Sequence, residues 1–143
     1  MKIDYKNTGL KMLERANSSN DQIFGSFYLS RLLGLDITFE KEKCMVHFDS
    51  IPNFFNPQGT LHGGIISTLM DISMGHLFER KQLNGTTIEL KTNFLLPIKK
   101  ENIICEGSYI KKGKSISVMA AKLYRKDKRL AAYATSTWKV FDN

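Results

Sequence analysis

Apolar residues dominate the segment between positions 65 and 80 of this 143-residue chain. With about 100° of rotation per residue, they cover roughly two thirds of a helix circumference. Such a wide apolar face is typical of a helix enclosed by other structure. The apolar positions are Ile65, Ile66, Leu69, Met70, Ile72, Met74, Leu77 and Phe78. The pattern predicts a buried core helix over 65–80, interrupted by nothing except Gly75.

After this helix the apolar pattern changes to a period of two, which predicts β-structure. Ile88, Leu90 and the apolar positions up to Leu96 alternate with Glu89, Lys91 and Asn93. Turn residues at Gly113 and at Asp127-Lys128 divide the remainder. The further predicted strands cover about 102–112, 115–126 and 130–141.

Ahead of the core helix we expect helices near 5–18 and 24–33, followed by a strand over 35–48. We expect one domain over 1–143, with an N-terminal helical segment at 1–34 and a core at 35–143. A long helix held by consecutive antiparallel strands is an α+β arrangement, with the sheet wrapped around the helix.

A loop runs directly into the start of the core helix. Pro57 and Gly59 break regular structure, and His62-Gly63-Gly64 can open the helix. A helix N-terminus presents unpaired backbone N–H groups, and glycine there lets a ligand approach the backbone closely. We therefore expect this end of the helix to hold an anion or a carbonyl oxygen.

The narrow remaining face of the helix carries Gly64, Thr68, Asp71 and Gly75. Small residues flank the acid, so this stripe can admit a ligand or a partner backbone, and we predict Gly64 and Thr68 as substrate-binding residues. A carboxylate beside a buried helix is a candidate base or nucleophile. The alternative is that Asp71 points into solvent from the helix edge.

The spacing of the two candidate groups predicts an assembly. Asp71 lies eight residues beyond Gly63, which places it about 12 Å along the same helix. One chain cannot easily bring both to one bond. If both act on the same carbonyl, a second copy must supply one of them, and a two-fold dimer then has two equivalent sites at its interface.

The run Asn56-Pro57-x-Gly59-x-x-His62-Gly63-Gly64, with Leu69-x-Asp71 and Gly75, is followed by the strand from Thr87 to Pro97. This combination resembles the hotdog-fold acyl-CoA thioesterases of the phenylacetyl-CoA thioesterase branch. The resemblance extends from about residue 35 to the C-terminus, and the first thirty residues add little to it. It implies a hotdog fold and the hydrolysis of an acyl-CoA or aryl-CoA thioester, without a cofactor, in a dimer or a tetramer.

The resemblance also implies roles for individual residues. Asp71 is the general base or the nucleophile, and Gly63 donates its backbone N–H to the thioester carbonyl. Asn56 and His62 position the thioester, and Thr87 orients the attacking water. Whether Asp71 attacks directly or activates water stays open.

The net charge of +7 calls for an explanation. Basic residues gather at predicted turns, and we expect Lys111, Lys112, Gly113, Lys114 and Ser115 to bind the phosphates of coenzyme A. The alternative is that these lysines form solvated strand ends. No nucleic-acid-binding motif accompanies them, so we expect no nucleic-acid partner.

Aromatic residues, histidines and cysteines are further candidates for binding or metal-ligating groups. Phe54 and Phe55, directly before Asn56, either line the acyl pocket or pack the loop against the core. The three histidines and two cysteines lack zinc-like spacing, so we expect no metal site. On the apolar side of the helix, His76 is expected to be a core or interface residue. Cys44 and Cys105 are expected to be free buried thiols.

The chain has no apolar run of transmembrane length and no secretory signal at its start, so we expect no membrane partner and a cytoplasmic location. Two other functions remain open on the same fold. One is a non-catalytic acyl-CoA sensor, which has no use for a buried base. The other is a hotdog dehydratase or hydratase, for which His62 is the candidate residue.

Overall fold

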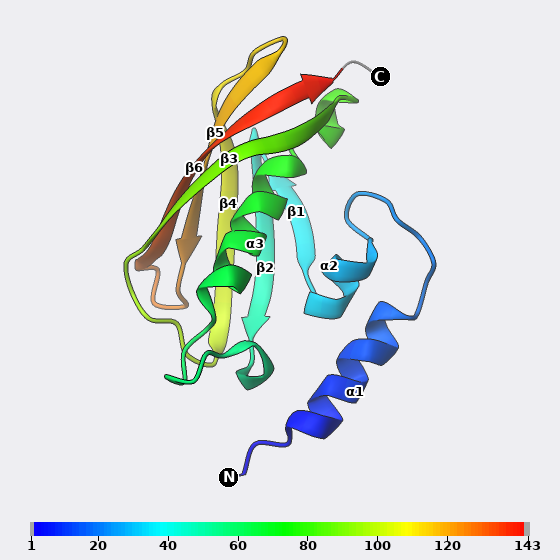
Figure 1. Cartoon of the computed structure of the whole chain (residues 1–143), viewed down its shortest axis with the longest axis vertical. Coiled ribbons are helices and arrows are strands. Elements are labelled where there is room, and N and C mark those ends of the chain that lie inside the picture. Colours follow the sequence, from blue (N-terminus) through cyan, green and yellow to red (C-terminus); the bar gives the residue numbers. More distant parts are fainter. Residues whose placement is uncertain (1, 142–143) are drawn as a thin grey trace.

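A six-stranded antiparallel sheet with one long helix against it forms the centre of the computed structural model, which describes residues 2–141 (Figure 1). In spatial order the strands run β1-β2-β4-β5-β6-β3. Their bounds are β1 (Asp36–Glu40), β2 (Lys43–Ser50), β3 (Asn84–Phe94), β4 (Glu101–Lys111), β5 (Ile116–Tyr124) and β6 (Leu130–Phe141). The helices are α1 (Tyr5–Ala16), α2 (Tyr28–Leu33) and α3 (Gly63–Gly75), with short 3₁₀ helices η1 (Pro52–Phe54) and η2 (Glu79–Lys81).

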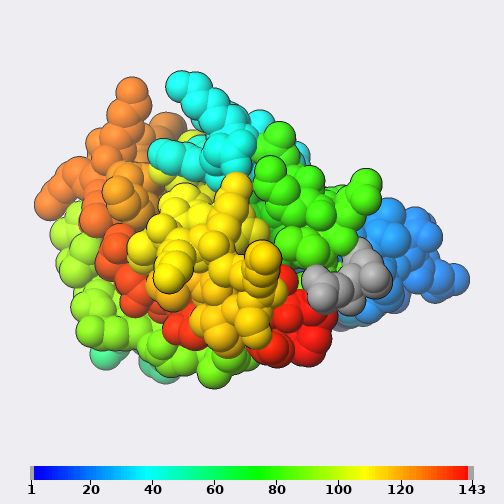
Figure 2. Space-filling model, turned by 90° about the horizontal axis from the view of Figure 1, so that it is seen from above, coloured from blue at the N-terminus to red at the C-terminus, as the bar shows by residue number. Residues whose placement is uncertain are grey.

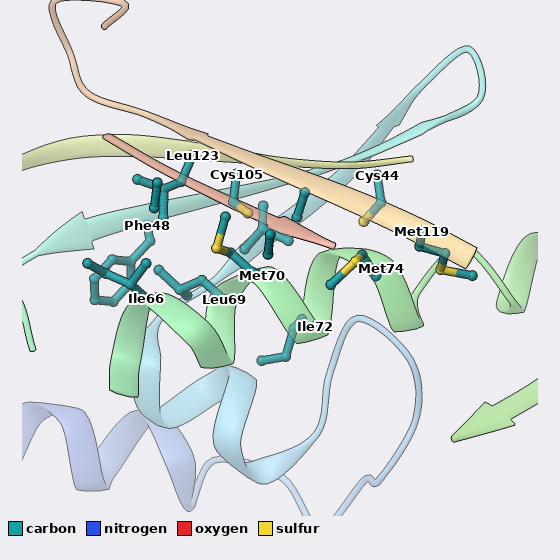
Figure 3. Close-up of a cluster of buried hydrophobic side chains, with 14 of the residues drawn as sticks. Cys44, Phe48, Ile66, Leu69, Met70, Ile72, Met74, Cys105, Met119 and Leu123 are labelled. Carbon is teal, nitrogen blue, oxygen red and sulfur yellow. The ribbon is translucent and has the colours of Figure 1, made fainter. Parts of the chain in front are cut away.

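The core lies between α3 and the face of the sheet that it crosses. Met70 and Met74 are fully buried and point toward the strands, whereas Ile72 points the opposite way, toward the N-terminal helices (Figure 3). Apolar residues therefore surround most of α3, as its pattern predicts. The α+β arrangement expected from the sequence is confirmed.

Helix α3 and strand β4 approach each other closely at Gly107. A Cβ atom on this residue would lie 2.3 Å from the carbonyl oxygen of Ser73, so only glycine fits without a shift of the helix. Nearby, the Cys105 thiol donates to the Ser73 hydroxyl at 3.5 Å. Burial raises the pKa of the Cys44 and Cys105 thiols to about 12. Both cysteines are free and buried, as expected.

The two edges of the sheet are unlike each other. Strand β1 is short, and the guanidinium of Arg80 lies 5.1 Å from the ring centre of its Phe39. Strand β3 has 11 residues and pairs with β6 alone within the described chain. A bulge interrupts that pairing at Ile88, which is 57% exposed. The β3 edge is thus long and uncovered.

The N-terminal helices pack beside one another, and two arginines connect them. Arg15 of α1 donates to the carbonyl oxygen of Leu32 at 2.9 Å. Arg31 of α2 donates to carbonyl oxygens of Ala16, Ser19, Asp21 and Ser26. These bonds order the connection between the helices, which lies beside α3 (Figure 1).

Three of the element boundaries that differ from the sequence prediction have a clear physical reason. The predicted strand 35–48 is a hairpin, because Lys41 adopts a left-handed conformation with φ 54° and turns the chain. The second helix begins at Tyr28 instead of 24, because a tight turn joins Ile23 to Ser26 and Gly25 has φ +79°.

The third difference concerns the core helix, which ends at Gly75 and does not continue to 80. The N–H of Leu77 bonds to the carbonyl of Met74, and that of Phe78 to Gly75, so the backbone tightens after the helix. This turn directs Phe78 into the core, where its ring centre lies 5.4 Å from that of Trp138. The apolar pattern past Gly75 therefore reflects burial in a turn.

Candidate active site

His62 begins α3 as its N-cap. Its Nδ1 atom accepts a hydrogen bond from the Gly64 N–H at 2.9 Å, and its carbonyl accepts from the Ile65 N–H. The bond to Gly64 identifies Nε2 as the protonated nitrogen of the neutral ring. Gly63, between them, makes no backbone N–H bond to any other described residue. The helix therefore begins with one free donor.

The loop before the helix is held by the side chain of Asn56. Its Oδ1 accepts from the Gln58 N–H at 3.0 Å and from the Thr60 N–H at 3.2 Å. Its Nδ2 donates to the Thr60 hydroxyl at 3.0 Å. Asn56 and Gly63 line the same hollow, of about 280 Å³, and the ring of Phe94 from β3 forms another part of its wall.

The candidate acid, Asp71, points toward β3. The hydroxyl of Thr87 donates to its Oδ1 at 2.7 Å, and its Oδ2 makes no hydrogen bond to another described residue. Asp71 is half-buried, so the solvent-directed alternative considered for it does not hold. The carboxylate has one oxygen fixed by the protein and one available to a ligand or a water.

A second, larger cleft of about 1010 Å³ opens beside Asp71. Thr68 and Gly75 from the same face of α3 line it, together with Trp138. The Thr68 hydroxyl donates back to the Gly64 carbonyl at 2.9 Å. The narrow stripe predicted from the sequence thus forms one side of a real cleft, although Gly64 lines neither hollow.

Comparison with known proteins assigns this arrangement to a family. The family model of the thioesterase superfamily matches residues 58–132, which contain both the helix start and Asp71. A Saccharolobus solfataricus protein that is provisionally named as an esterase is 32% identical over 133 residues, covering 92% of this chain and 91% of that protein.

The chain belongs to the thioesterase superfamily. It is a thioester hydrolase, as the sequence motif indicates. Another relative of this thioesterase, the medium/long-chain acyl-CoA thioesterase YigI of Escherichia coli, is 26% identical, covering 78% of this chain and 84% of YigI.

Solved structures of similar proteins confirm the hotdog fold of this thioesterase. The BH2602 protein of Bacillus halodurans, solved with CoA, superimposes with a TM-score of 0.86 at 21% identity, covering 100% of this chain and 97% of that one. The PaaI protein of the E. coli phenylacetic acid degradation operon gives a TM-score of 0.77 at 16% identity, covering 95% and 97% of the two chains. At these identities the likeness concerns the fold.

Two groups of predicted site residues of the thioesterase lie in different places within one chain. Asp71, Thr87 and Thr68 lie at or beside the larger cleft, and Asn56 and Gly63 line the smaller hollow. His62 caps the helix next to the smaller hollow. The single chain therefore does not bring the acid and the free donor together.

The basic loop of the thioesterase forms the tip of the β4–β5 hairpin. Figure 2 shows this tip beside the turn between β1 and β2, where Lys112 pairs with Glu42 at 3.1 Å. The hydrogen bond and charge of Lys112 hold the pKa of Glu42 below its ordinary value. A Cβ on Gly113 would collide with the Ile116 carbonyl, so the turn needs glycine. The exposed residues Lys111, Lys114 and Ser115 complete the tip, which lines neither hollow.

The aromatic pair before Asn56 packs against the core of the enzyme. The ring centre of Phe54 lies 5.8 Å from that of Phe48, and both Phe54 and Phe55 are partly buried. Neither lines the larger cleft or the smaller hollow. The geometry favours packing, and their substrate-binding role stays a prediction.

His76 is buried at one end of the larger cleft, which confirms that it is a core histidine. Its Nε2 accepts the Gly25 N–H at 3.0 Å, and its Nδ1 lies 2.9 Å from the Ile72 carbonyl. These partners require Nδ1 to carry the proton and Nε2 to be unprotonated. Burial lowers the pKa of His76 below its ordinary value, against the bond to Ile72 and the charge of Glu79.

Sequence reasoning missed one part of the cleft. Ile23, Phe24 and Phe27, from the connection between α1 and α2, and Leu29, from the first turn of α2, form part of its lining. They lie more than forty positions before Asp71, in and after a turn without a repeating pattern. No periodic signal links such a turn to a distant helix face.

Within residues 2–141, no helix is long and apolar enough to span a membrane.

Proposed function

We propose that this thioesterase hydrolyses acyl-CoA thioesters to a carboxylic acid and free coenzyme A. The observation that carries the proposal is the Asp71 carboxylate, fixed by Thr87 through one oxygen and free of described protein partners at the other. The names of two similar proteins support the substrate class: YigI is an acyl-CoA thioesterase, and the BH2602 structure contains CoA.

Asp71 supplies the attack on the thioester in one of two ways. As a general base, its free oxygen takes a proton from a water whose oxygen adds to the carbonyl carbon. As a nucleophile, the carboxylate adds directly and forms an anhydride that water then cleaves. In both cases the carbon–sulfur bond breaks and the thiolate of coenzyme A leaves and takes up a proton. Thr87 positions the carboxylate, and a water bound at the free oxygen, for this attack.

Gly63 supplies the donor for the carbonyl oxygen. Its free N–H lies at the positive end of the α3 dipole, where negative charge on the oxygen is stabilised as the bond forms. One such donor is typically worth about 3 kcal/mol of barrier. Asn56 lines the same hollow and positions the thioester. His62 contacts the thioester through Nε2, because its Nδ1 already accepts the Gly64 N–H.

The complete site requires two chains. Asp71 and Gly63 lie about 12 Å apart along α3, too far for one carbonyl group. The long, uncovered edge of β3 carries Thr87, which bonds to Asp71 of the larger cleft, and Phe94, which lines the smaller hollow. A two-fold axis beside this edge would place the Gly63 end of one chain opposite the Asp71 of the other. We infer a homodimer, and a tetramer formed by two such dimers.

The basic hairpin tip binds the phosphates of coenzyme A. Lys111, Lys112 and Lys114 are exposed there, and Gly113 lets the turn close tightly before Ser115. Exposed cations of this kind attract a multiply charged nucleotide. Because the tip lines neither hollow of its own chain, it reaches the coenzyme outside the clefts. We place the enzyme in the cytoplasm, where its two free cysteines stay reduced.

The test is thiol release from a panel of acyl-CoA esters by the wild type and by Asp71→Asn. We expect release by the wild type and a loss of about 10³-fold in kcat for the variant, since it keeps the shape and removes the base. Binding of coenzyme A should persist. Asp36→Asn, which changes an exposed acid on β1, is the matched control.

Other outcomes would identify the other functions. Tight acyl-CoA binding without thiol release across the panel would indicate that the protein is an acyl-CoA sensor and not an enzyme. Conversion between a hydroxyacyl-CoA and its enoyl form, again without thiol release, would indicate a dehydratase or hydratase. Full activity of Asp71→Asn would remove Asp71 from the mechanism.

A further inference from the structure

One wall of the larger cleft comes from the connection between α1 and α2 and from the first turn of α2. We call residues 22–29 the N-terminal wall. Ile23, Phe24 and Leu29 from this wall line the cleft together with Asp71. On the basis of the proposed function, we propose that the N-terminal wall binds the acyl group and that Phe24 limits the length of the acyl chain that is accepted.

The chemistry of the cleft fits a hydrocarbon chain. Leu90 and Trp138 from the sheet and Ile72 from α3 line it opposite the apolar residues of the wall. Its volume of about 1010 Å³ is large for a small acyl group such as acetyl. Since Asp71 must reach the carbonyl carbon, the chain attached to that carbon has this apolar space beside it.

The exposed apolar side chains of the wall also need an explanation. Ile23 is 61% exposed, and Phe24 and Leu29 are each 41% exposed. Exposed apolar side chains that line the same cleft are typical of a ligand-binding groove or an interaction site. Because the same cleft contains the candidate base, the occupant that fits best is the acyl group of its substrate.

The wall is fixed in place and not a loose loop. The Gly25 N–H donates to Nε2 of His76, and the ring of Phe24 meets that of His76 edge-on, with 5.2 Å between ring centres. From the other side, the Arg31 guanidinium donates to the carbonyls of Asp21 and Ser26. Phe24 therefore has a defined position, and a fixed aromatic ring can set a length limit.

The test compares kcat/KM along a series of straight-chain esters from butyryl-CoA to palmitoyl-CoA. Phe24→Ala should shift the preferred length upward, raising kcat/KM for the longest esters relative to butyryl-CoA by about tenfold. Phe24→Trp should shift the preference downward. The control is Leu10→Ala, which removes an exposed apolar side chain from α1 and should keep the wild-type profile. Unchanged profiles in both Phe24 variants would overturn the proposal.

A binding measurement separates this proposal from the hydrolytic function. Trp138 is the only tryptophan of the chain and lines the cleft, so its fluorescence reports occupancy. In an Asp71→Asn background, palmitoyl-CoA should alter the emission more than coenzyme A alone, and adding Phe24→Ala should change the affinity for palmitoyl-CoA but not for butyryl-CoA.

The two failures are distinct. If binding depends on chain length and changes in the Phe24 variants, but the wild type releases no thiol, hydrolysis is contradicted and acyl binding by the N-terminal wall is supported. If the wild type releases thiol but binding is the same in the Phe24 variants, hydrolysis is supported and acyl binding by the N-terminal wall is contradicted. A weakened oligomer in Phe24→Ala with an unchanged length profile would instead assign the wall to contact between copies of the chain.

Discussion

The two hollows beside α3 offer different groups to a thioester. The larger contains the carboxylate of Asp71, held by Thr87, and large apolar residues form part of its lining. The smaller contains the free N–H of Gly63 and the amide of Asn56, and no acid lines it. Attack on a thioester needs both a base and a donor for the carbonyl oxygen. Each hollow therefore offers one half of what the reaction needs, and this difference is the reason for the proposed dimer.

After the loss of Asp71 itself, the largest expected effect comes from removing the donor in the smaller hollow. Gly63→Pro eliminates the N–H at the first helical position, where proline is well tolerated. His62 already has φ −63° and ψ 133°, which suits a residue before proline. We expect kcat to fall by about 10²- to 10³-fold. The rate of thiol release from acyl-CoA measures this fall in kcat.

Gly63→Ala is the matched control for that substitution. It keeps the N–H but places a Cβ 3.2 Å from the Phe94 ring, so it isolates the steric effect. If alanine lowers kcat as much as proline does, the loss comes from crowding and the donor role fails.

Mixing two inactive variants sharpens the comparison between the hollows. In a mixed dimer of Asp71→Asn and Gly63→Pro chains, one interfacial site has both groups intact and the other has neither. Activity should therefore return when the two chains are co-refolded or co-expressed. If each site lies within one chain, every site in the mixture carries a lesion, and the mixture stays inactive.

A smaller effect is expected from Thr87→Val in the larger cleft. Valine keeps the shape but removes the hydroxyl that donates to Asp71. A hydrogen bond to a charged group is worth roughly 1.5 kcal/mol or more, so kcat should fall about tenfold or slightly further. Thr87→Ser should restore most of the rate, which a purely structural role of the methyl group would not allow. A neutral result for valine would mean that something else positions the carboxylate.

The basic tip should affect binding more than turnover. Replacing Lys112 and Lys114 together by Ala should raise KM for acyl-CoA by roughly three- to tenfold, because exposed charges contribute about 1 kcal/mol or less each. Hydrolysis of a short thioester without the nucleotide should not change. The paired control is Lys6→Ala with Lys11→Ala on α1. Equal losses with both substrates would contradict a phosphate-binding role.

The smallest effect is a pH dependence of stability that His76, beside the larger cleft, should produce. Because burial lowers the pKa of His76 in the folded state, the unfolded chain binds a proton first as pH falls. This contribution to stability is present above the unfolded-state pKa of about 6.5 and is lost as pH falls through the folded-state value. Thermal unfolding between pH 7 and pH 5 should show a smaller loss for His76→Gln than for the wild type. Equal losses would exclude His76 as the source.

The helix start could be predicted from the sequence because its signal is local, and the choice of Asp71 as the candidate acid rests on a local signal too. Glycine after His62 and a lone acid on a narrow face are visible in the residues themselves. The hydrogen bond between Thr87 and Asp71 connects two elements, and only the resemblance to a family pointed to Thr87. The N-terminal wall could not be predicted, because nothing in the turn around Gly25 signals that it packs against His76.

Boundary errors have the same origin. Leu77 and Phe78 continue the helical pattern, yet they are buried by a turn after Gly75. Apolar periodicity reports which side chains are buried, and it does not report the backbone path that buries them. The hairpin at Lys41 was missed for a related reason, because no glycine, proline or asparagine marks its left-handed residue.

The buried cysteines make the enzyme convenient to assay. Disulfide reagents that count released coenzyme A react with thiolates, and Cys44 and Cys105 combine a pKa of about 12 with almost no exposure. Folded protein should therefore add no background colour, whereas unfolded protein should add two reactive thiols per chain. One reagent can then read both turnover and the folded fraction of every variant in the same cuvette.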